Sequence, residues 1–580
     1  MTDSLIGTGR MGFFKKLWRL IKPYWTSEER WVARALLGLV IALNLGLVYL
    51  NVQFNDWYGR FYDALQDKNL PHFWRELGIF TGLAFAYIAV AVYQYYVRQM
   101  LYLRWRRWLT QRYLKNWLAN RVYYRIELAN RATDNPDQRI QDDVGSFASQ
   151  TLFLGLDAMS KFVTVCSFFL ILWDLSGPLN FTIAGLAITI PGYMLWAAII
   201  YAVAGSGLIQ WIGRKLANLY FGQQRYEADF RFSLVRLREN AEGVALYRGE
   251  GDESVRLLER FERVLDNWLA IMRLNKTLYW FTNFYSQLAV IFPFVVGAPR
   301  YFSGLIKLGT LMQIANAFGT VQDALSWFIN SYQDIANWRA SVDRLTSFDQ
   351  AIAQAVASGE GGIRVVPAPQ ASLSIEHAMV ETPDRKPLLT ADATIAEGEH
   401  VLLAGASGSG KSTLFRVIAG IWPYGAGQVI LPQLRRLLFL PQKPYVPIGS
   451  LRNAVTFPAE PGAFSDPEIV AALKACQLDE QTEHLDQEDH WDRRLSPGEQ
   501  QRLAVARALL QKPDWLFLDE ATSALDPELE AKLYRLIRER LPKTTVLSIA
   551  HRAELNAFHE RRLRLVAGEK GTVLKSEPVG

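Results

Sequence analysis

The glycine-rich stretch GASGSGKST, at residues 405–413, directly follows the apolar run HVLLA. A strand that leads into such a loop lets backbone N–H groups converge on phosphate oxygens, because glycine permits the tight turn. Lys411 is suited to neutralise the β and γ phosphates, and the Ser412 hydroxyl is suited to coordinate Mg²⁺. The stretch therefore predicts a site for a nucleoside triphosphate. Its residues are Gly405, Ala406, Ser407, Gly408, Ser409, Gly410, Lys411, Ser412 and Thr413.

A second apolar strand, in DWLFLDEATSALD at 514–526, ends in two carboxylates. Asp519 is suited to hold Mg²⁺, and Glu520 is suited to polarise the water that attacks the γ-phosphate. An acidic pair after a strand is common by itself. Because this pair follows a phosphate-binding loop by about 110 residues, we expect metal-assisted phosphoryl transfer, in this case hydrolysis of the nucleoside triphosphate.

Between these elements, LSPGEQQRLAVARALL at 495–510 predicts the beginning of a helix. Ser496 is suited to cap the helix, Pro497 fits its first position, and Glu499 completes a capping box. A helix N-terminus with a free hydroxyl also favours phosphate. In isolation the stretch would be only a helix start, but beside the two other motifs it predicts a third contact with the nucleotide.

The three motifs together resemble those of ATP-binding cassette (ABC) proteins, whose signature is usually Leu-Ser-Gly-Gly-Gln. Ser496 and Gly498 remain here, while Pro497 and Glu499 depart from the pattern. Proline removes one backbone donor, so we expect the γ-phosphate to rely on the Ser496 hydroxyl and the Gly498 N–H.

The same resemblance assigns roles to isolated residues. It implies that Gln442, in FLPQKPYVP, senses the γ-phosphate and helps to hold Mg²⁺ with Ser412 and Asp519. It implies that His551, in TVLSIAHR, is the switch histidine that contacts the γ-phosphate. Asp526 matches the loop that communicates across a nucleotide-bound dimer, whereas the aromatic residue that stacks on adenine in many cassettes would align near Thr382 and is missing. We therefore predict four catalytic residues, Lys411, Gln442, Glu520 and His551. We predict three ligands of Mg²⁺, Ser412, Gln442 and Asp519.

Six apolar runs are long enough to cross about 30 Å of hydrocarbon as helices. A run of this length needs a bilayer or a large core around it. The 580-residue chain has a net charge of +6 but no concentrated basic face, which argues against a nucleic-acid partner. We predict spans near 33–54, 77–97, 151–173, 181–206, 278–299 and 307–329. The third and fourth spans are joined by the short turn DLSGPLN, whose residues 175–180 carry no charge, and are expected to form a helical hairpin.

Charge predicts the orientation of the spans. The segment 98–139 carries ten Arg or Lys residues, whereas the loop at 175–180 has none. By the positive-inside rule both termini lie in the cytosol. The stretch FFKKLWRLIKPYW at 13–25 interleaves apolar and basic residues, as a helix lying in the membrane surface does. Two cysteines, Cys166 and Cys476, do not make a disulfide framework.

Some charges fall inside the predicted spans. Asp157 and Lys161 are four residues apart, so they would share a helix face and are placed to pair. Asp323 lies in the sixth run. Ionisable groups within a membrane are candidates for function, although a structural pair or a cavity-facing carboxylate explains them equally well.

The domain organisation follows from a change of composition. We predict an all-α, six-helix transmembrane domain at 1–345, a linker at 346–372 that includes GEGGIRVVPAPQAS, and an α/β P-loop NTPase domain at 373–580. A cassette needs two copies, because the signature of one closes on the phosphate loop of the other. One set of motifs and six spans therefore predict a half-transporter that acts as a homodimer.

The membrane half resembles the SbmA/BacA-like uptake transporters and their cassette-bearing relatives. The resemblance rests on FNDWYGRFYDALQDKN (54–69), NPDQRIQDDV (135–144) and, most specifically, RLRENAEGVALYRGE (236–250). It implies an exporter-type fold with helices extending into the cytosol. It also implies that Glu239, Asn240 and Glu242 couple ATP closure to gate movement, while the charges around them otherwise serve as a solubilising surface.

We therefore expect an ATP-driven transporter of peptides, cobalamin or similar hydrophilic solutes in the bacterial inner membrane, with uptake as the favoured direction. Three alternatives remain. A fatty-acyl exporter shares the last two motifs of the membrane half. A proton-driven carrier with a regulatory cassette is disfavoured by Glu520 and His551. A nucleotide-gated channel is disfavoured by the retained catalytic glutamate.

Overall fold

The computed structural model describes residues 12–129, 135–183, 186–358, 361–433, 435–569 and 571–578. The chain folds into two compact units, which we call the helical unit and the sheet unit. The helical unit holds residues 1–114 and 135–348, and the sheet unit holds residues 115–134 and 349–580. The predicted fold class, a multidomain chain with helices first and an α/β domain second, is confirmed.

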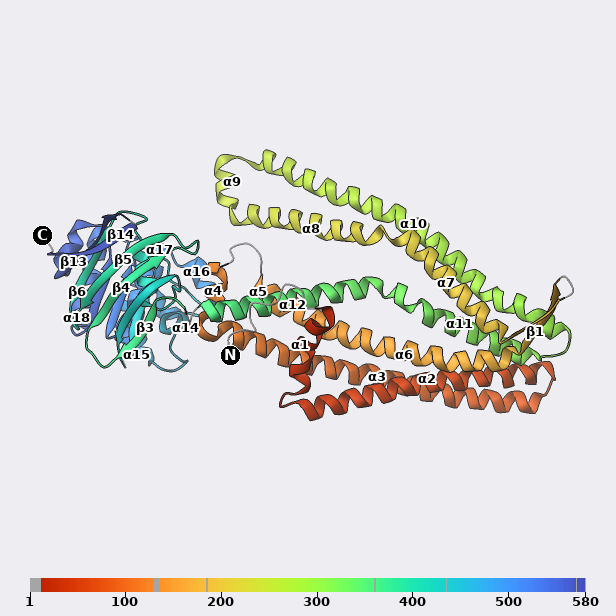
Figure 1. Ribbon diagram of the computed structural model, residues 1–580. Helices are drawn as coiled ribbons and strands as arrows, with labels where there is room; N and C mark the ends of the chain where they lie inside the picture. The colour runs from red at the N-terminus through yellow and green to blue at the C-terminus, as the bar shows by residue number, and fades with distance from the viewer. Residues whose placement is uncertain are drawn as a thin grey trace. The chain divides into compact units, whose positions relative to one another are not determined.

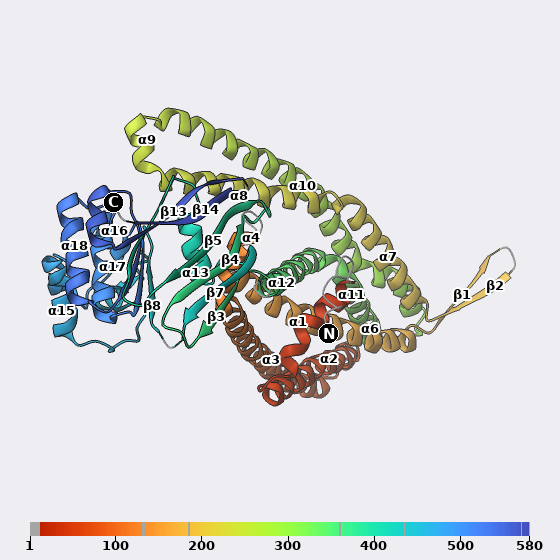
Figure 2. The ribbon, with the colours of Figure 1, turned by 60° about the vertical axis from the view of Figure 1, so that its left-hand side comes forward.

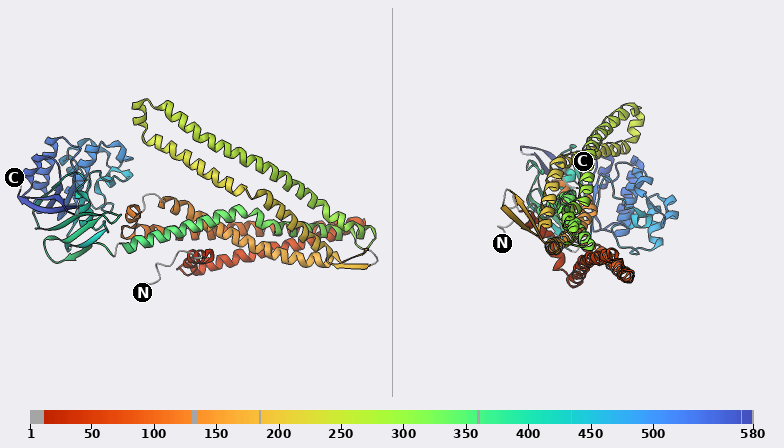
Figure 3. Two further views of the ribbon diagram at one scale, coloured as in Figure 1. Left: turned by 45° about the horizontal axis from the view of Figure 1, so that its top comes forward. Right: turned by 90° about the vertical axis from the view of Figure 1, so that its right-hand side faces the viewer.

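Long helices make up the helical unit. Helices α2, α3, α6 and α11 run alongside one another, and α8 and α10 form a long hairpin closed by α9 (Figure 1; Figure 3, left). The elements are α1 (Phe13–Trp25), α2 (Arg30–Gln66), α3 (Leu70–Leu118), α5 (Pro136–Gln138), η2 (Arg139–Asp143), α6 (Val144–Ser176), β1 (Pro178–Ile183), β2 (Leu186–Pro191), α7 (Tyr193–Gly213), α8 (Leu216–Glu239), α9 (Ala241–Tyr247), α10 (Glu250–Phe302), α11 (Leu308–Asn330) and α12 (Tyr332–Ser358).

Five helical stretches in the described part of the chain are long and apolar enough to cross a membrane. They are Arg30–Gln66, Leu70–Ala129, Pro136–Ser176, Tyr193–Glu239 and Glu250–Phe302. Each contains one of the first five predicted runs or most of it. Helix α11 occupies the place of the sixth predicted span but is not among the five, because polar residues such as Gln313, Asn316, Gln322 and Asp323 interrupt it.

The fourth predicted span, 181–206, is wrong in its first half. Strands β1 and β2 form an antiparallel hairpin with Pro178 opposite Pro191, and helix α7 begins only at Tyr193. The apolar run from 181 to 190 is rich in β-branched residues, which favour strands as readily as a buried helix. A helical hairpin was therefore predicted where the chain makes a β-hairpin between α6 and α7.

Helix α1 is amphipathic, as predicted, but one face of it is occupied by protein. Leu20 and Tyr24 are buried, and Tyr24 stacks on Trp105 of α3 with 5.6 Å between ring centroids. The Lys16 ammonium donates to the Asp343 carboxylate of α12 at 2.7 Å. Phe14 and Trp18, one turn apart, stay exposed on the other face, which is where a membrane surface would contact the helix.

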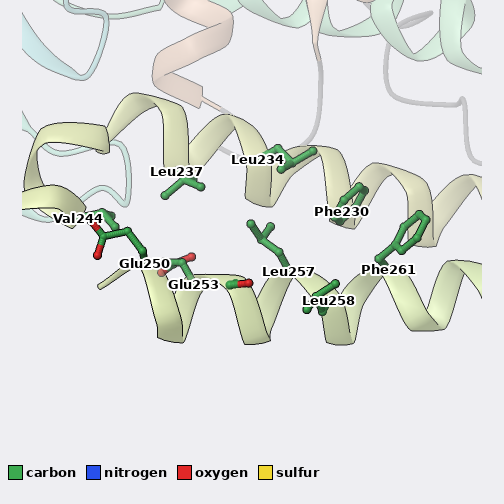
Figure 4. A pocket seen from close by; sticks show the side chains of 10 residues that line it. Phe230, Leu234, Leu237, Val244, Glu250, Glu253, Leu257, Leu258 and Phe261 are labelled. Carbon is green, nitrogen blue, oxygen red and sulfur yellow. The ribbon is translucent and has the colours of Figure 1, made fainter. Parts of the chain in front are cut away.

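The hairpin of α8 and α10 is held together by apolar side chains near α9. Figure 4 shows side chains of the two helices pointing toward one another across a groove of about 570 Å³. The apolar residues that line it most fully are Phe230, Leu234, Leu237, Leu257, Leu258 and Phe261. At the tip, Glu239 ends α8 and Asn240 donates its side-chain amide to the Arg236 carbonyl at 2.8 Å, before α9 begins.

The sheet unit is built on one mixed sheet. In the described residues its order is β3-β7-β4-β5-β14-β13-β6-β12-β11-β8. The strands are β3 (Arg364–Ala368), β4 (Leu373–Glu381), β5 (Pro387–Ile395), β6 (His400–Gly405), β7 (Gly425–Pro432), β8 (Leu437–Leu440), β11 (Trp515–Asp519), β12 (Thr545–Ile549), β13 (Arg561–Gly568) and β14 (Gly571–Pro578), with a separate small pair β9 (Gly449–Ser450) and β10 (Glu488–Asp489).

Helices cover both faces of the parallel strands β8, β11, β12 and β6. Alternate residues of β11 point to opposite faces, so Leu516 and Leu518 join a core with α17 and α18, while Trp515 and Phe517 join another with α13. Figure 2 shows α17 and α18 along one side of the sheet. The helices are α13 (Lys411–Ile418), α14 (Leu451–Thr456), α15 (Asp466–Ala475), η3 (Asp479–His484), α16 (Trp491–Arg494), α17 (Pro497–Gln511), α18 (Pro527–Arg540) and η4 (Ala553–Phe558).

The structure differs from the predicted linker at 346–372. Helix α12 continues to Ser358, and β3 pairs in parallel with β7 from Arg364 to Ala368. Residues 359 and 360 of the predicted linker lie outside the described residues. Glycine and proline suggested a loop, but a proline at the sheet edge is compatible with a strand.

The sheet unit also recruits a segment from the membrane half of the sequence. Residues of η1 (Ala119–Arg121) and α4 (Val122–Ala129) cluster with it rather than with the helical unit. The Arg121 guanidinium donates to the Ala419 carbonyl at 2.5 Å, and Arg125 donates to the Ala355 carbonyl at 3.4 Å. Leu128 packs against the core beside α13. The unit therefore begins before the boundary at 373 that composition suggested for the α/β domain.

Candidate active site

The phosphate-loop glycines adopt conformations that other residues rarely take. Gly405, Gly408 and Gly410 have φ angles of +155°, +77° and +98°. A Cβ on Gly410 would lie 2.6 Å from Leu389 Cδ2, and one on Gly405 would lie 2.8 Å from Ser409 Oγ. The backbone conformation favours glycine at all three positions, and the lack of space requires it at Gly405 and Gly410 as well. The loop therefore connects β6 to α13 as the sequence predicted.

Lys411 is buried at the first turn of α13 and points back over the loop. Its ammonium donates to the Gly405 and Ala406 carbonyls, at 3.0 Å each. Ser409 N donates to the Ala406 carbonyl at 3.2 Å, and Ser409 Oγ is buried without a hydrogen-bond partner among the described residues. A cation held over a ring of glycines matches an anionic ligand such as a triphosphate.

The next two predicted residues meet across the sheet. Ser412 Oγ, in α13, donates to Asp519 Oδ1, at the end of β11, at 2.9 Å. Burial raises the pKa of Asp519, the Ser412 hydrogen bond opposes this effect, and the neighbouring Glu520 adds to it. A hydroxyl and a carboxylate oxygen side by side are the hard ligands that Mg²⁺ prefers.

Glu520 is held from two sides. Gln442 Nε2 donates to Glu520 Oε2 at 3.0 Å, and His551 Nε2 lies 2.9 Å from Glu520 Oε1. Glu520 itself has a φ of +50°, which is unusual for a residue with a side chain. Its N–H still pairs with the Ile549 carbonyl of β12 at 3.1 Å. The strained backbone aims the carboxylate away from the strand and toward its two partners.

The signature helix α17 begins as predicted. Ser496 Oγ accepts from the Glu499 N–H at 3.3 Å, and Glu499 Oε2 accepts from the Ser496 N–H at 2.8 Å, which completes the capping box. Within the described residues, no hydrogen bond joins Ser496 or Gly498 to the phosphate loop. A Cβ on Gly498 would approach Leu525 Cδ2 to 3.3 Å, so the helix start is also packed against the segment that follows Glu520.

Sequence reasoning missed Gln501, which connects these parts. Its side-chain amide donates to the Gln442 carbonyl at 3.0 Å and its Oε1 accepts from the Ala524 N–H at 2.9 Å. Gln501 is buried on α17. The sequence offered one signal for Gln501: it is a polar residue at a helical position that faces the core. Asp526, also predicted, caps α18 by accepting from the Leu529 N–H at 2.9 Å.

Thr382 lies in the turn between β4 and β5, and its N–H donates to the Lys386 carbonyl at 2.9 Å. Two aromatic residues from another part of the chain lie beside this turn. Trp422 Nε1 donates to the Glu381 carbonyl at 2.9 Å, and the Arg385 guanidinium lies 5.8 Å from the centroid of the Tyr424 ring. The aromatic side chains of Trp422 and Tyr424 therefore lie close to Thr382, the position at which the sequence lacks the residue that stacks on adenine.

The structure thus brings Lys411, Ser412, Asp519, Glu520, Gln442 and His551 to one edge of the sheet. The strands that carry them are parallel, and their carboxyl ends meet at that edge. Ser496 and Gly498 lie at the start of a different helix.

Comparisons with known proteins agree with this geometry. Residues 20–302 match the family described as ABC transporter transmembrane region 2, and residues 388–523 match the family described as ABC transporter. An uncharacterized ABC transporter ATP-binding protein of Haemophilus influenzae is 36% identical over 95% of this chain and 92% of its own length. The inner membrane ABC transporter ATP-binding protein YddA of Escherichia coli is 32% identical over 92% of this chain and 94% of its own length. The human lysosomal cobalamin transporter ABCD4 is 29% identical over 97% of this chain and 96% of its own length.

The chain belongs to the ABC transporters that carry a transmembrane region and an ATP-binding domain in one polypeptide. It is a multi-pass membrane protein, it binds ATP, and it couples ATP hydrolysis to transport.

Proposed function

We propose that two copies of the chain form an ATP-driven transporter that takes up a hydrophilic solute, such as a peptide or a cobalamin, across a bacterial inner membrane. The observation that carries the proposal is the complete hydrolytic set, in which Glu520 is held between Gln442 and His551 beside the Ser412–Asp519 pair. The names of two relatives support parts of this proposal. One relative is a cobalamin transporter, which supports the solute, and another is an inner membrane protein, which supports the membrane. The resemblance to SbmA/BacA-like uptake transporters supports the direction.

Each residue has a role in this proposal. Residues 405–413 cradle the phosphates, and Lys411 neutralises the β and γ oxygens instead of its own loop carbonyls. Ser412, Asp519 and Gln442 would hold Mg²⁺, which supplies charge neutralisation on the phosphates when it is bound. Glu520 accepts a proton from the attacking water. His551 orients Glu520, because its Nε2 lies 2.9 Å from the Glu520 carboxylate. We also assign to His551 the role of sensing the γ-phosphate.

The position of the signature supports a homodimer. Ser496 and Gly498 begin a helix that makes no hydrogen bond to the phosphate loop of the same chain in the described part of the structure. We propose that they complete the site of a second copy. A mixture of Lys411→Ala chains with Ser496→Arg chains should then retain at most one working site, because in a mixed dimer the two changes fall in the two halves of the same composite site and leave the other site intact. Cross-linking that yields only monomers would contradict the dimer.

The orientation belongs to the proposal as well: both termini and the α8–α9–α10 hairpin lie on the cytosolic side. Glu239, Asn240 and Glu242, at the tip of that hairpin, are proposed to couple ATP closure to the movement of the spans. Accessibility of single cysteines at the tip and in the β1–β2 hairpin to a membrane-impermeant reagent in intact cells would test this orientation.

The central test uses Glu520→Gln, which retains shape and hydrogen bonding but cannot accept the proton. General-base assistance contributes roughly 10²–10⁴ in rate, so hydrolysis should fall by that factor while ATP still binds. Solute uptake into proteoliposomes should stop with it. Uptake in the variant that ignores ATP and follows an imposed pH gradient would instead establish a proton-driven carrier. Export of a fatty-acyl thioester, measured in the same vesicles, would instead establish a fatty-acyl exporter.

A further inference from the structure

Polar contacts join Asp143, which ends η2, and three residues of α6 to α12 and α11. The partners follow one another in opposite directions along the two segments, which is the register of antiparallel helices. The contacts are Asp143 with the Arg344 guanidinium at 2.9 Å, Ser146 Oγ with Ser341 Oγ at 3.5 Å, Thr151 Oγ1 with Trp338 Nε1 at 2.8 Å, and Asp157 Oδ2 with Trp327 Nε1.

The same register places Lys161 opposite Asp323. Lys161 lies four residues beyond Asp157 on α6, and Asp323 lies four residues before Trp327 on α11. Four residues are about one helical turn, so both side chains return to the faces that carry the previous contact. The Lys161 ammonium also acts electrostatically on the Asp323 carboxylate. No ion pair within 4.0 Å closes the two groups in the described part of the chain, and the predicted pair of Lys161 with Asp157 is likewise not formed.

Lys161 lies far from both ends of α6, whereas Asp323 lies seven residues before Asn330, the end of α11. Lys161 is 15 residues from Ser176, the end of α6, and Asp323 is 15 residues from Leu308, the start of α11. At 1.5 Å per residue each lies about 22 Å from that end. Asp323 is exposed and Lys161 is half-buried. A charge that faces hydrocarbon is costly, so these two groups require a polar surrounding.

We propose that Lys161 and Asp323 form a solute-binding subsite that takes a zwitterion, a hydrophilic solute with one cationic and one anionic group; this rests on the transport function proposed above. Asp157 is already engaged by the Trp327 N–H, so one ammonium and one carboxylate remain to bind a ligand. The solute's ammonium pairs with Asp323 and its carboxylate with Lys161. A purely anionic solute satisfies Lys161 alone and is repelled by Asp323.

A short peptide with free termini is the simplest probe of this chemistry. Binding of radiolabelled trialanine to the full chain in lipid nanodiscs, without nucleotide, is compared with binding of its N-acetylated and C-amidated forms. Wild type should prefer the free peptide over each blocked form by roughly tenfold, since a charge-assisted hydrogen bond is lost each time. Equal binding of the three forms, or no binding of any, would overturn the proposal.

Two variants assign the two charges. Asp323→Asn should abolish the preference for a free amine and keep that for a free carboxylate, whereas Lys161→Met should do the reverse. Asp157→Asn is the matched control and should preserve both preferences, because its partner is Trp327. If every variant merely weakens binding of all three peptides alike, the residues have a structural role and the subsite is refuted. Wild-type ATP hydrolysis, measured in the same nanodiscs, reports separately on the proposed function.

Discussion

The two units use polar side chains in different ways. In the sheet unit, polar groups from several strand ends gather at one edge, where Ser412 meets Asp519 and Gln442 and His551 meet Glu520. In the helical unit, polar contacts are spread along α6, α11 and α12, with about one to three turns between neighbours. The first arrangement concentrates charge for chemistry, and the second aligns helices.

The difference has a physical origin. A parallel sheet carries the ends of its strands to one edge, so a few residues after each strand make a site. A helix bundle offers no such edge, and polar residues between helices stabilise by satisfying one another in pairs. A change at this edge of the sheet should therefore affect a reaction rate, whereas a change in the packed parts of either unit should affect stability. The following predictions, from the largest expected effect to the smallest, test that contrast.

Lys411→Ala should reduce ATP hydrolysis by at least about 100-fold, because removal of one preorganised charge from a phosphoryl-transfer site costs roughly that much. Membrane insertion should be normal, because the helical unit has its own core. Lys543→Ala, at an exposed position of the same unit, is the control. Phosphate release from purified protein is the measurement, and wild-type activity in Lys411→Ala would refute the assigned site.

The sheet unit should lose stability in acid through His559. Burial lowers the pKa of His559 to about 4, and its Nδ1 lies 2.8 Å from the Leu555 carbonyl. An unfolded histidine has a pKa near 6.5, so the unfolded state binds the extra proton first as the pH falls. The stabilisation is fully present above about pH 6.5 and should be lost, by about 3 kcal/mol at most, as the pH falls to about 4.

Thermal unfolding of the detergent-solubilised chain at pH 7.5 and pH 5 measures this effect. His559→Asn should be less stable than wild type at pH 7.5, because it alters a packed site, but its unfolding temperature should change less between the two pH values. An equal change in variant and wild type would show that another group causes the acid sensitivity.

Two glycines of α11 provide a matched pair for the helical unit. A Cβ on Gly309 would lie 2.0 Å from the Gly59 carbonyl oxygen of α2, whereas one on Gly319 would meet nothing within 4 Å. Gly309→Ala should therefore force α2 and α11 apart and destabilise the unit by about 1–3 kcal/mol. Gly319→Ala should be neutral or slightly stabilising. Unfolding in a denaturing detergent series distinguishes them, and equal stability would contradict the close helix contact.

Arg344→Met should have the smallest effect of the four. Asp143 is buried and accepts from both Arg344 and Arg139, so Arg139 still compensates its charge after the change. We expect a loss of about 1–2 kcal/mol in the helical unit and little change in ATP affinity. Arg263→Met, at an exposed position of α10, is the control. A loss of ATP hydrolysis without a loss of stability would show that this contact serves coupling rather than alignment.

The candidate active site was predictable because its motifs are local. The phosphate loop, the Ser496 capping box and the carboxylates after β11 each follow from a few neighbouring residues, and parallel strands then bring Ser412 and Asp519 within 2.9 Å. Gln501 was missed because its two partners, Gln442 and Ala524, lie 59 and 23 residues away. Tyr424 and Trp422 were missed at the Thr382 turn for the same reason.

The fold was predictable where periodicity is unambiguous. Long apolar helices and the α/β order were read correctly, but the run from 181 to 190 satisfies strand and helix alike, and only pairing with its neighbour makes it β1–β2. The segment from Lys115 to Ala129 has no compositional mark that assigns it to the sheet unit; its arginines and Leu128 find partners there.

The sequence by itself determined the chemistry: a glycine loop with Lys411, a capped signature helix, and Asp519 and Glu520 after an apolar strand. These depend on backbone conformation and on spacings of a few residues, which chain connectivity enforces. The tertiary structure alone decided which helix faces meet, and therefore that Trp327 engages Asp157 and leaves Lys161 opposite Asp323. Such pairings join residues up to about 200 positions apart, and their register comes from side-chain packing between whole helices, which no local pattern specifies.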